Sequence, residues 1–313
     1  MDNFEKQWAG EETIVNIPPH FLIVGAPKAG TTSLYRYLQQ HPQIFMPENK
    51  EPRFFCGYST DVFEFGKKYF HAGIVSTKAD YLALFQDAPA GAISGEASTD
   101  YLSCPQAANR IHAWNPSAKI IIMLRNPVDR AYSEYQHSIA AKFQNNNFWE
   151  SLCLETDRIE QHYDPIFWHV RRGLYFEAVK EYIELFGKDR IRIVFFEEFA
   201  NSTASVVASL FEFLGVPAYP VSVTERHNAG SERTRHNMYQ IFCLGFARSI
   251  IQFIEKCLGQ QARLNIINRL PCNKKTSVRD RLSNKQYDWL RGNFREDILK
   301  LQELLGVNLD HWL

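Results

Sequence analysis

The chain of 313 residues lacks several features that define whole classes of protein. Its six cysteines show no CxxC or CxxH spacing, so we expect reduced thiols rather than a zinc site or a disulfide framework. The chain also has a net charge of zero, because its 35 basic residues balance 35 acidic ones. No overall field therefore attracts nucleic acid or an anionic membrane, and any anion site must be local.

Targeting and membrane-spanning signals are missing as well. The first twenty residues, MDNFEKQWAGEETIVNIPPH, have neither the basic nor the apolar region of a secretory signal. The apolar stretch MYQIFCLGFARSIIQFIEKCL, from Met238, is interrupted by charged residues. This predicts a helix packed on the sheet or covering a pocket, with membrane contact as the alternative. We therefore expect a cytoplasmic protein without a membrane span, and its oligomeric state stays open.

What the chain does contain is enough apolar material for one large core, with 45% hydrophobic and 14% aromatic residues. Apolar runs without alternation predict strands covered on both faces, at 20–26, 119–124 and 191–196, with a shorter one near Ile93. Helical patterns fall between and after them, at 31–40, 105–114, 128–140, 174–186 and 202–214. This alternation predicts a three-layer α/β fold, with a parallel sheet flanked by helices.

Beyond His227 the strand signals stop and helical patterns take over. The segment LSNKQYDWLRGNFREDILKLQELLG has helical periodicity and a glycine stop at Gly306. No internal repeat or linker is apparent. We therefore expect a single domain over 1–313, with an α/β core at about 21–216 and a helical C-terminal region at about 227–313 that packs on it.

The segment FLIVGAPKAGTTSL, from Phe21, has the outline of a phosphate-binding loop. Gly25 and Gly30 have the Walker spacing, but Thr31 takes the place of the Walker lysine, and the only lysine is Lys28. A turn from a strand into a helix directs backbone N–H groups and the positive end of the helix dipole at an anion. The pattern predicts an anion site; the alternative is an ordinary turn with a solvated lysine.

A second segment, IIIMLRNPVDRAYSEY, places a cation at the end of another strand. Kinase-type enzymes carry a carboxylate there to organise magnesium, whereas this chain has Arg125, with Ser133 about two turns along the next helix. An arginine and a serine so placed can grip a second phosphate. The alternative is a surface ion pair between Arg125 and Asp129.

Taken together, PKAGTTSL and LRNPVDRAYSEY resemble the two nucleotide-binding motifs of sulfotransferases that use 3′-phosphoadenosine 5′-phosphosulfate (PAPS) and release adenosine 3′,5′-bisphosphate (PAP). The resemblance implies a P-loop-like fold and no required metal. It implies that Lys28 holds the oxygen that bridges phosphate and sulfuryl group, and that Arg125 and Ser133 bind the 3′-phosphate. The implied residues around the 5′-phosphate are Ala29, Gly30, Thr31, Thr32 and Ser33.

In further detail the chain looks closest to heparan-sulfate-type and related bacterial sulfotransferases. ENKEPRFF, at 48–55, is similar to the segment that carries their catalytic carboxylate, which implies Glu51. GEASTDYL, at 95–102, matches a segment near the acceptor substrate, and RGLYFEAV, at 172–179, also resembles a family segment. From these segments we predict an acceptor site formed by Arg53, Phe54, Phe55, Glu96, Asp100, Tyr101 and Tyr175.

Two places depart from this family pattern. Glycan-modifying relatives often carry a lysine just after the glutamate of the GEASTDYL-like segment, where this chain has Ala97. Their loop that encloses the nucleotide is rich in lysine and glycine, whereas HNAGSERTR offers Arg233 and Arg235. We carry these two arginines as candidate nucleotide-binding residues.

The chemistry requires a group that takes a proton from the acceptor as the bond to sulfur forms. Glu51 is our candidate for this base; its alternative is an ion pair with Lys50 or Arg53. His41 is a rival base whose position at the end of the first helix suits packing or capping. Two other functions remain as alternatives: a P-loop nucleotide kinase, and a nucleotide-binding protein without catalysis.

The charge near the predicted acceptor site favours a small neutral or cationic acceptor. Such an acceptor would be a metabolite or natural product that carries a hydroxyl or an amine. The segments expected there bring Glu51, Glu96 and Asp100, whereas a polyanionic glycan needs a cleft lined by cations. Glu96 and Asp100 have an alternative role as caps of the helix that begins near Pro105.

Overall fold

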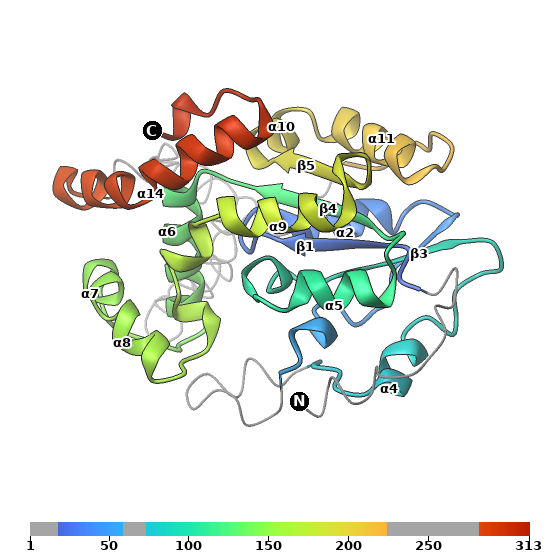
Figure 1. Ribbon diagram of the computed structural model, residues 1–313, viewed down its shortest axis with the longest axis horizontal. Helices are drawn as coiled ribbons and strands as arrows, with labels where there is room; N and C mark the ends of the chain where they lie inside the picture. Colours follow the sequence, from blue (N-terminus) through green and yellow to red (C-terminus); the bar gives the residue numbers. More distant parts are fainter. Residues whose placement is uncertain (1–17, 59–72, 224–281) are drawn as a thin grey trace, which may run out of the picture. The chain divides into compact units, whose positions relative to one another are not determined.

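A computed structural model describes residues 18–58, 73–223 and 282–313 (Figure 1). Within them, five parallel strands form a sheet of order β2-β3-β1-β4-β5. The strands are β1 (Phe21–Gly25), β2 (Ile44–Phe45), β3 (Ile93–Ala97), β4 (Lys119–Leu124) and β5 (Ile191–Phe195). The predicted parallel sheet is thus confirmed, and only β2, whose two residues carry no readable pattern, was missed.

The centre of the sheet is its most apolar part. Phe21 to Val24 of β1 and Ile120 to Leu124 of β4 have no solvent-exposed surface. Burying each such aliphatic side chain stabilises the fold by about 1.5–3 kcal/mol. Because successive side chains of a strand point to opposite faces, both faces of β1 and β4 must be covered by helices.

Helices cover the sheet on its two faces, as right-handed crossovers require. On one face α2 (Thr31–Leu38) contacts α11 (Thr203–Leu214), and on the other α5 (Ala107–Trp114) contacts α9 (Phe176–Phe186) (Figure 1). All four were predicted within two residues at each end. The three-layer architecture is therefore confirmed.

The connection from β4 to α9 is long and mostly helical. It begins with α6 (Pro127–Ala140), whose cap Asn126 accepts a hydrogen bond from the Val128 N–H at 3.0 Å. The sequence did not predict the six-residue helices, because fewer than two turns give no clear 3.6-residue period. These are α4 (Lys78–Ala83), α7 (Phe148–Cys153), α8 (Glu155–Glu160) and α10 (Phe196–Asn201).

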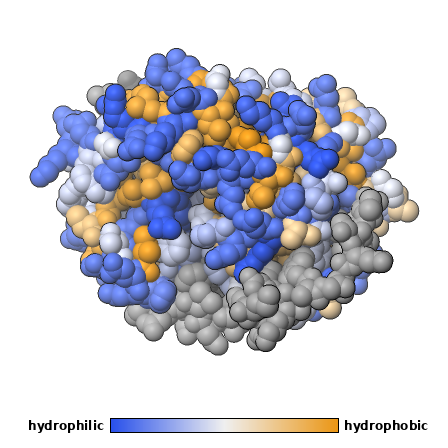
Figure 2. All heavy atoms as spheres, viewed as in Figure 1, coloured by the Kyte–Doolittle hydropathy of each residue, from blue (hydrophilic) through white to orange (hydrophobic). Residues whose placement is uncertain are grey.

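Six short 3₁₀ segments complete the described structure: η1 (Phe54–Cys56), η2 (Tyr101–Ser103), η3 (Pro165–Phe167), η4 (Arg171–Gly173), η5 (Lys188–Arg190) and η7 (Asp310–Trp312). Figure 2 shows that hydrophilic residues interrupt the hydrophobic ones on one face of the molecule. No helix in the described parts of the chain is both long and apolar enough to cross a membrane.

Near its C-terminus the chain returns to the α/β unit through α14 (Asn284–Leu305). One face of this helix buries Leu290, Phe294, Ile298 and Leu301, which follow the helical period. Asp297 accepts hydrogen bonds from the backbone N–H groups of Tyr175 at 2.8 Å and Phe176 at 3.1 Å, and so satisfies the start of α9.

The chain divides into two compact units, 1–227 with 288–313, and 228–287. Most of the second unit lies outside the described residues, and so does the apolar helix predicted from Met238. The single domain over 1–313 stays a prediction.

Candidate functional site

The first turn of the predicted phosphate loop follows β1 directly. Lys28 has a φ of 65° and Gly30 a φ of 91°, the left-handed region that suits glycine. Gly30 is the N-cap of α2, and no side chain in the described residues caps it. Ser33 N–H donates to the Gly30 carbonyl at 3.0 Å. Among the described residues, the N–H groups of Thr31 and Thr32 at the start of this eight-residue helix keep their hydrogen-bonding capacity for an anion.

Arg125 joins this turn from the end of β4. Its Nη1 donates a hydrogen bond to the Lys28 carbonyl at 3.0 Å, and its guanidinium lies 4.5 Å from the centre of the Phe196 ring. Its Nε is buried without a hydrogen-bond partner among the described residues. The two motifs, 97 residues apart, thus meet at one edge of the sheet. Asp129 makes no ion pair with Arg125 within the described residues, although its charge raises the pKa of Arg125.

Several cations act on Lys28. Burial lowers the pKa of Lys28, the charge of Glu134 raises it, and the charges of Arg125, Lys50 and Arg130 lower it further. Positive charge that depresses the pKa of a lysine also attracts an anion to the same place. The surroundings of Lys28 therefore suit a ligand of high negative charge.

His137, on α6, also belongs to these surroundings and was missed in the sequence. Burial and the charge of Lys28 lower the pKa of His137 to about 4. The imidazole is thus neutral near pH 7. It lies one helical turn beyond Ser133, which is half-buried on α6. That spacing of four residues is the signal that could have identified it.

Glu51 lies beside the carboxyl end of β3. Its N–H donates to the Ala97 carbonyl at 2.9 Å, and its carboxylate accepts from the Thr99 N–H at 2.8 Å. It also pairs with Lys50 and keeps a fifth of its side chain exposed. Burial raises the pKa of Glu51, but the charges of Lys50 and Arg53 and these hydrogen bonds outweigh burial and lower it. The carboxylate is therefore ionised at neutral pH and able to accept a proton.

A chain of five buried charges lies beneath these residues. Arg53 Nε is 2.8 Å from Asp100 Oδ2, and Asp100 also pairs with Arg172. Glu134 accepts from Arg172 Nη1 at 2.7 Å and from Arg130 Nη1 at 2.6 Å. This ion-pair chain ties β3 to α6 and to the segment before α9. Sequence reasoning missed it, because only Arg130 and Glu134 are close along the chain, four residues apart on α6, and the other three residues come from distant segments.

The ion-pair chain corrects two predicted roles. Arg53 and Asp100 are 7% and 3% exposed and bind each other, so direct contact with an acceptor is the wrong role for them. Capping of the helix near Pro105 by Asp100 or Glu96 is also wrong, because Gln106 is the N-cap of α5 and no side chain makes a capping hydrogen bond there.

Three of the four predicted acceptor-site aromatics are core residues. Phe54, Phe55 and Tyr101 are at most 1% exposed. The Phe54 ring stacks on Tyr81 with centroids 4.3 Å apart, and Phe55 meets Trp114 edge to face at 5.8 Å. Their predicted contact with the acceptor is therefore wrong. The sequence alone does not distinguish aromatic residues that line a pocket from those that fill a core.

Glu96 is buried against this aromatic cluster. Its carboxylate accepts hydrogen bonds from the Tyr81 hydroxyl at 3.2 Å and from the Ser98 hydroxyl at 3.0 Å. Burial raises the pKa of Glu96 to about 7. With 1% exposure it lies beneath the site rather than on its surface, so the predicted acceptor contact is wrong for Glu96 as well.

Tyr175 is placed differently from its predicted role, whereas His41 has the packing role that its position in the sequence suggested. Tyr175 is buried, and its hydroxyl donates to the Arg125 carbonyl at 2.9 Å, which ties it to the end of β4. His41 is also buried: Gln43 N–H donates to its Nδ1 at 3.0 Å, and its Nε2 lies 2.9 Å from the Pro217 carbonyl. Both ring nitrogens are engaged, so His41 has a packing role. Arg233 and Arg235 lie outside the described residues.

The ion-pair chain predicts a specific dependence of stability on pH. Burial raises the pKa of Glu134, but Arg130 and Arg172 outweigh burial and lower it to about 2. A depressed carboxyl pKa stabilises the fold above the unfolded value of about 4.5, here by about 3 kcal/mol, and this contribution is lost as pH falls toward 2. Glu134→Gln should therefore lower the free energy of unfolding at pH 7 by at least that amount in urea titrations.

The matched control is Glu303→Gln on the exposed face of α14. It should leave the unfolding free energy within about 0.5 kcal/mol of the unaltered protein. Below pH 4.5 the difference in unfolding free energy between Glu134→Gln and the unaltered protein should become smaller. A difference that stays constant from pH 7 to pH 3 would contradict the charge-based explanation.

Comparison with known proteins identifies the family. Residues 18–261 match the sulfotransferase domain, and the chain therefore belongs to this family. The matched range contains Lys28, Glu51, Arg125 and Ser133. A crystal structure of a sulfotransferase from Alicyclobacillus acidocaldarius is 31% identical, covers 95% of this chain and 99% of that one, and superimposes with a TM-score of 0.74.

Curated relatives are similar over part of their length. Carbohydrate sulfotransferase 15 of Mus musculus is 24% identical over 248 residues, 63% of this chain and 44% of the relative. Bifunctional heparan sulfate N-deacetylase/N-sulfotransferase 4 of Mus musculus is 30% identical over 236 residues, 69% of this chain and 24% of the relative. The chain thus spans less than half the length of these two relatives.

Proposed function

We propose that this protein transfers a sulfuryl group from PAPS to a hydroxyl or amine of a small acceptor molecule. The observation that carries the proposal is the contact between the two motifs, in which the Arg125 guanidinium reaches the backbone of Lys28. Two cations that meet at the uncapped start of a helix suit a ligand with two separate phosphate groups. Membership of the sulfotransferase domain family supports PAPS as that ligand.

The donors around the first turn fit such a ligand. The N–H groups at the start of α2 and the hydroxyls of Thr31 and Thr32 would hold the 5′-phosphate. Arg125, with its unpartnered Nε, and Ser133 would hold the 3′-phosphate. PAPS supplies the reactive sulfuryl group when bound.

Lys28 and Glu51 have separate tasks in this proposal. The Lys28 ammonium stabilises negative charge on the departing phosphate, which grows as the sulfuryl group moves. Glu51 accepts the proton that the acceptor hydroxyl or amine loses. Lys50 acts on both residues, because it pairs with Glu51 and its charge lowers the pKa of Lys28. Thr99 holds the carboxylate in orientation through its N–H and hydroxyl.

The acceptor class rests on fewer observations. The preference for a neutral or cationic acceptor depended on Glu96 and Asp100, and both are buried and engaged with other residues. We keep the proposal of a hydroxyl or amine acceptor. These two carboxylates no longer support a preference for a neutral or cationic acceptor. The cytoplasmic location and the sulfation of a natural product or metabolite likewise stay predictions.

Glu51→Gln tests the base directly. The amide keeps the size of the side chain and one hydrogen-bond acceptor for Thr99, but it cannot take a proton at neutral pH. We expect PAP affinity within about threefold of the unaltered protein, and acceptor turnover lower by about 100-fold to 10,000-fold. Calorimetric titration with PAP and a radiolabelled sulfate-transfer assay measure the two quantities.

Glu48→Gln is the matched control for this experiment, because Glu48 is exposed three residues earlier in the same segment. It should retain both affinity and turnover. If Glu51→Gln turned over as fast as the control, the role of general base would have to be given to another residue. If neither protein bound PAP, the proposed function itself would fail.

A further inference from the structure

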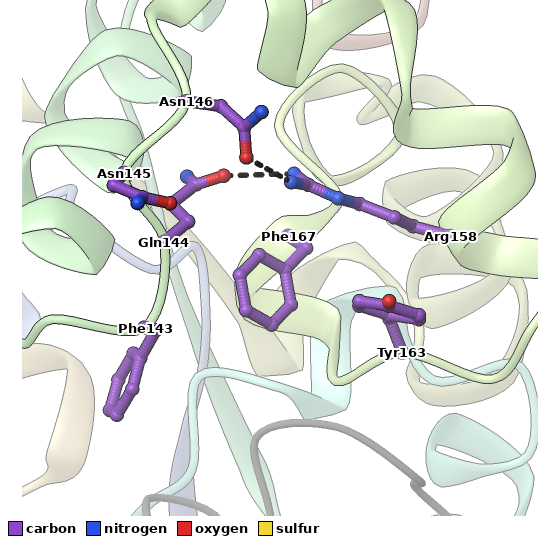
Figure 3. Close-up of a pocket in the computed structure, with 7 residues that line it drawn as sticks. All are labelled: Phe143, Gln144, Asn145, Asn146, Arg158, Tyr163 and Phe167. Carbon is purple, nitrogen blue, oxygen red and sulfur yellow. Dashed lines mark hydrogen bonds between the residues drawn. The ribbon is translucent and has the colours of Figure 1, made fainter.

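A pocket apart from the candidate nucleotide site lies between α8 and the segment that follows α6 (Figure 3). Its volume is about 270 Å³. Three amide side chains, Gln144, Asn145 and Asn146, approach from one side, and Arg158, Tyr163 and Phe167 from the other (Figure 3). We call it the Arg158 pocket. A neighbouring hollow of about 730 Å³ shares the amides and adds Lys142.

The charge of the Arg158 pocket is one-sided. Among the described residues, no aspartate or glutamate lines this pocket or the neighbouring hollow. The chain as a whole has as many acidic as basic residues, so a lining without acids is a local property. Arg158 and Lys142 supply positive charge there, and amide N–H groups supply neutral donors.

Arg158 is buried without a carboxylate partner in the described part of the chain. It is 7% exposed, and its Nη1 and Nη2 donate to Gln144 Oε1 at 2.9 Å and Asn146 Oδ1 at 3.3 Å. Glu155, one turn earlier in α8, accepts instead from the backbone N–H groups of Val170 and Arg171, both at 2.8 Å. The described hydrogen bonds of the guanidinium therefore go to neutral amide oxygens, and Glu155 acts on Arg158 only through its charge, without an ion pair.

The buried arginines of the ion-pair chain make the contrast clear. Arg130 and Arg172 each pair with a carboxylate, as the cost of burying a charge demands. Arg158 pays that cost without such a partner, and burial lowers the pKa of Arg158. A ligand with one negative charge would supply the missing counter-charge.

We propose that the Arg158 pocket binds a carboxylate carried on an aromatic ring. A guanidinium has five N–H groups, of which the described contacts use two, so a planar carboxylate can still be bound by the others. The centres of the Phe167 and Tyr163 rings lie 5.0 Å and 6.0 Å from the guanidinium carbon of Arg158, so that aromatic surface lies beside the charge. The volume of about 270 Å³ suits a single ring with its carboxylate.

Benzoate is the probe for this site, with benzamide as its neutral isostere. Ligand-observed NMR titration of the full chain, with and without saturating PAP, should give millimolar affinity for benzoate and none for benzamide in the same range. Arg158→Gln should weaken benzoate binding at least tenfold. Asn145→Asp should weaken it severalfold by adding negative charge at an exposed position that has no described contact with Arg158.

Gln86→Glu is the matched control, since it adds the same charge at an exposed residue outside the lining. It should leave benzoate binding unchanged. Benzoate that binds Asn145→Asp and Arg158→Gln as well as the unaltered chain would overturn the proposal, and so would equal binding of benzamide. Loss of benzoate binding on addition of PAP would also overturn it, because the cations of the nucleotide site would then be the ones bound. If Arg158→Gln does not fold, Asn145→Asp decides the question.

Discussion

Lys28→Met is expected to slow sulfuryl transfer by about 100-fold to 1000-fold, the range found when one preorganised donor to a developing negative charge is removed. Methionine keeps the length and apolar stem of lysine but not its charge. Because the ammonium acts on charge that grows during the reaction and is complete only in the product PAP, affinity for PAPS should fall much less than turnover. Single-turnover transfer rates and calorimetric titration with PAPS in the absence of acceptor separate the two effects.

Lys188→Met is the control for this substitution, because Lys188 is exposed in η5. It should transfer as fast as the unaltered protein. The pH dependence offers a second readout: burial lowers the pKa of Lys28, so activity should decline on the alkaline side at a lower pH than an ordinary lysine would give. Equal rates for Lys28→Met and the control would remove Lys28 from the mechanism.

Arg125→Gln is expected to weaken PAP binding by roughly 100-fold, because each hydrogen bond to a charged group contributes about 1.5–3 kcal/mol. The loss should be specific to the 3′-phosphate. The unaltered protein should therefore prefer PAP to adenosine 5′-phosphate strongly, whereas the variant should bind the two nucleotides almost equally. Calorimetric titration with both nucleotides measures this preference.

Arg295→Gln, on the exposed face of α14, is the matched control and should keep the full preference for PAP. Part of any loss in Arg125→Gln comes from the hydrogen bond to the Lys28 carbonyl. Adenosine 5′-phosphate reveals that part, since its binding does not involve a 3′-phosphate. If the variant bound both nucleotides more weakly by the same factor, Arg125 would only stabilise the conformation of the turn, and it would not bind the 3′-phosphate.

The sequence alone determined the sheet and the turn that carries the candidate anion site. Unbroken apolar runs such as KIIIML predict buried strands because a strand covered on both faces excludes polar side chains. The order of strands and helices then restricts the topology to parallel, right-handed crossovers. Gly30 and Lys28 lie within one local turn, so their proximity needs no long-range information.

Only the tertiary structure decided which polar and aromatic residues are buried. Asp100 reads as an acceptor-site carboxylate in GEASTDYL, yet it pairs with Arg53, 47 positions earlier, and with Arg172, 72 positions later. Phe54 and Phe55 fill the core beside Tyr81. The Arg158 pocket likewise depends on a loop after α6 that meets α8. The physical reason is that solvation and pairing are set by neighbours in space, whereas local patterns report only neighbours along the chain.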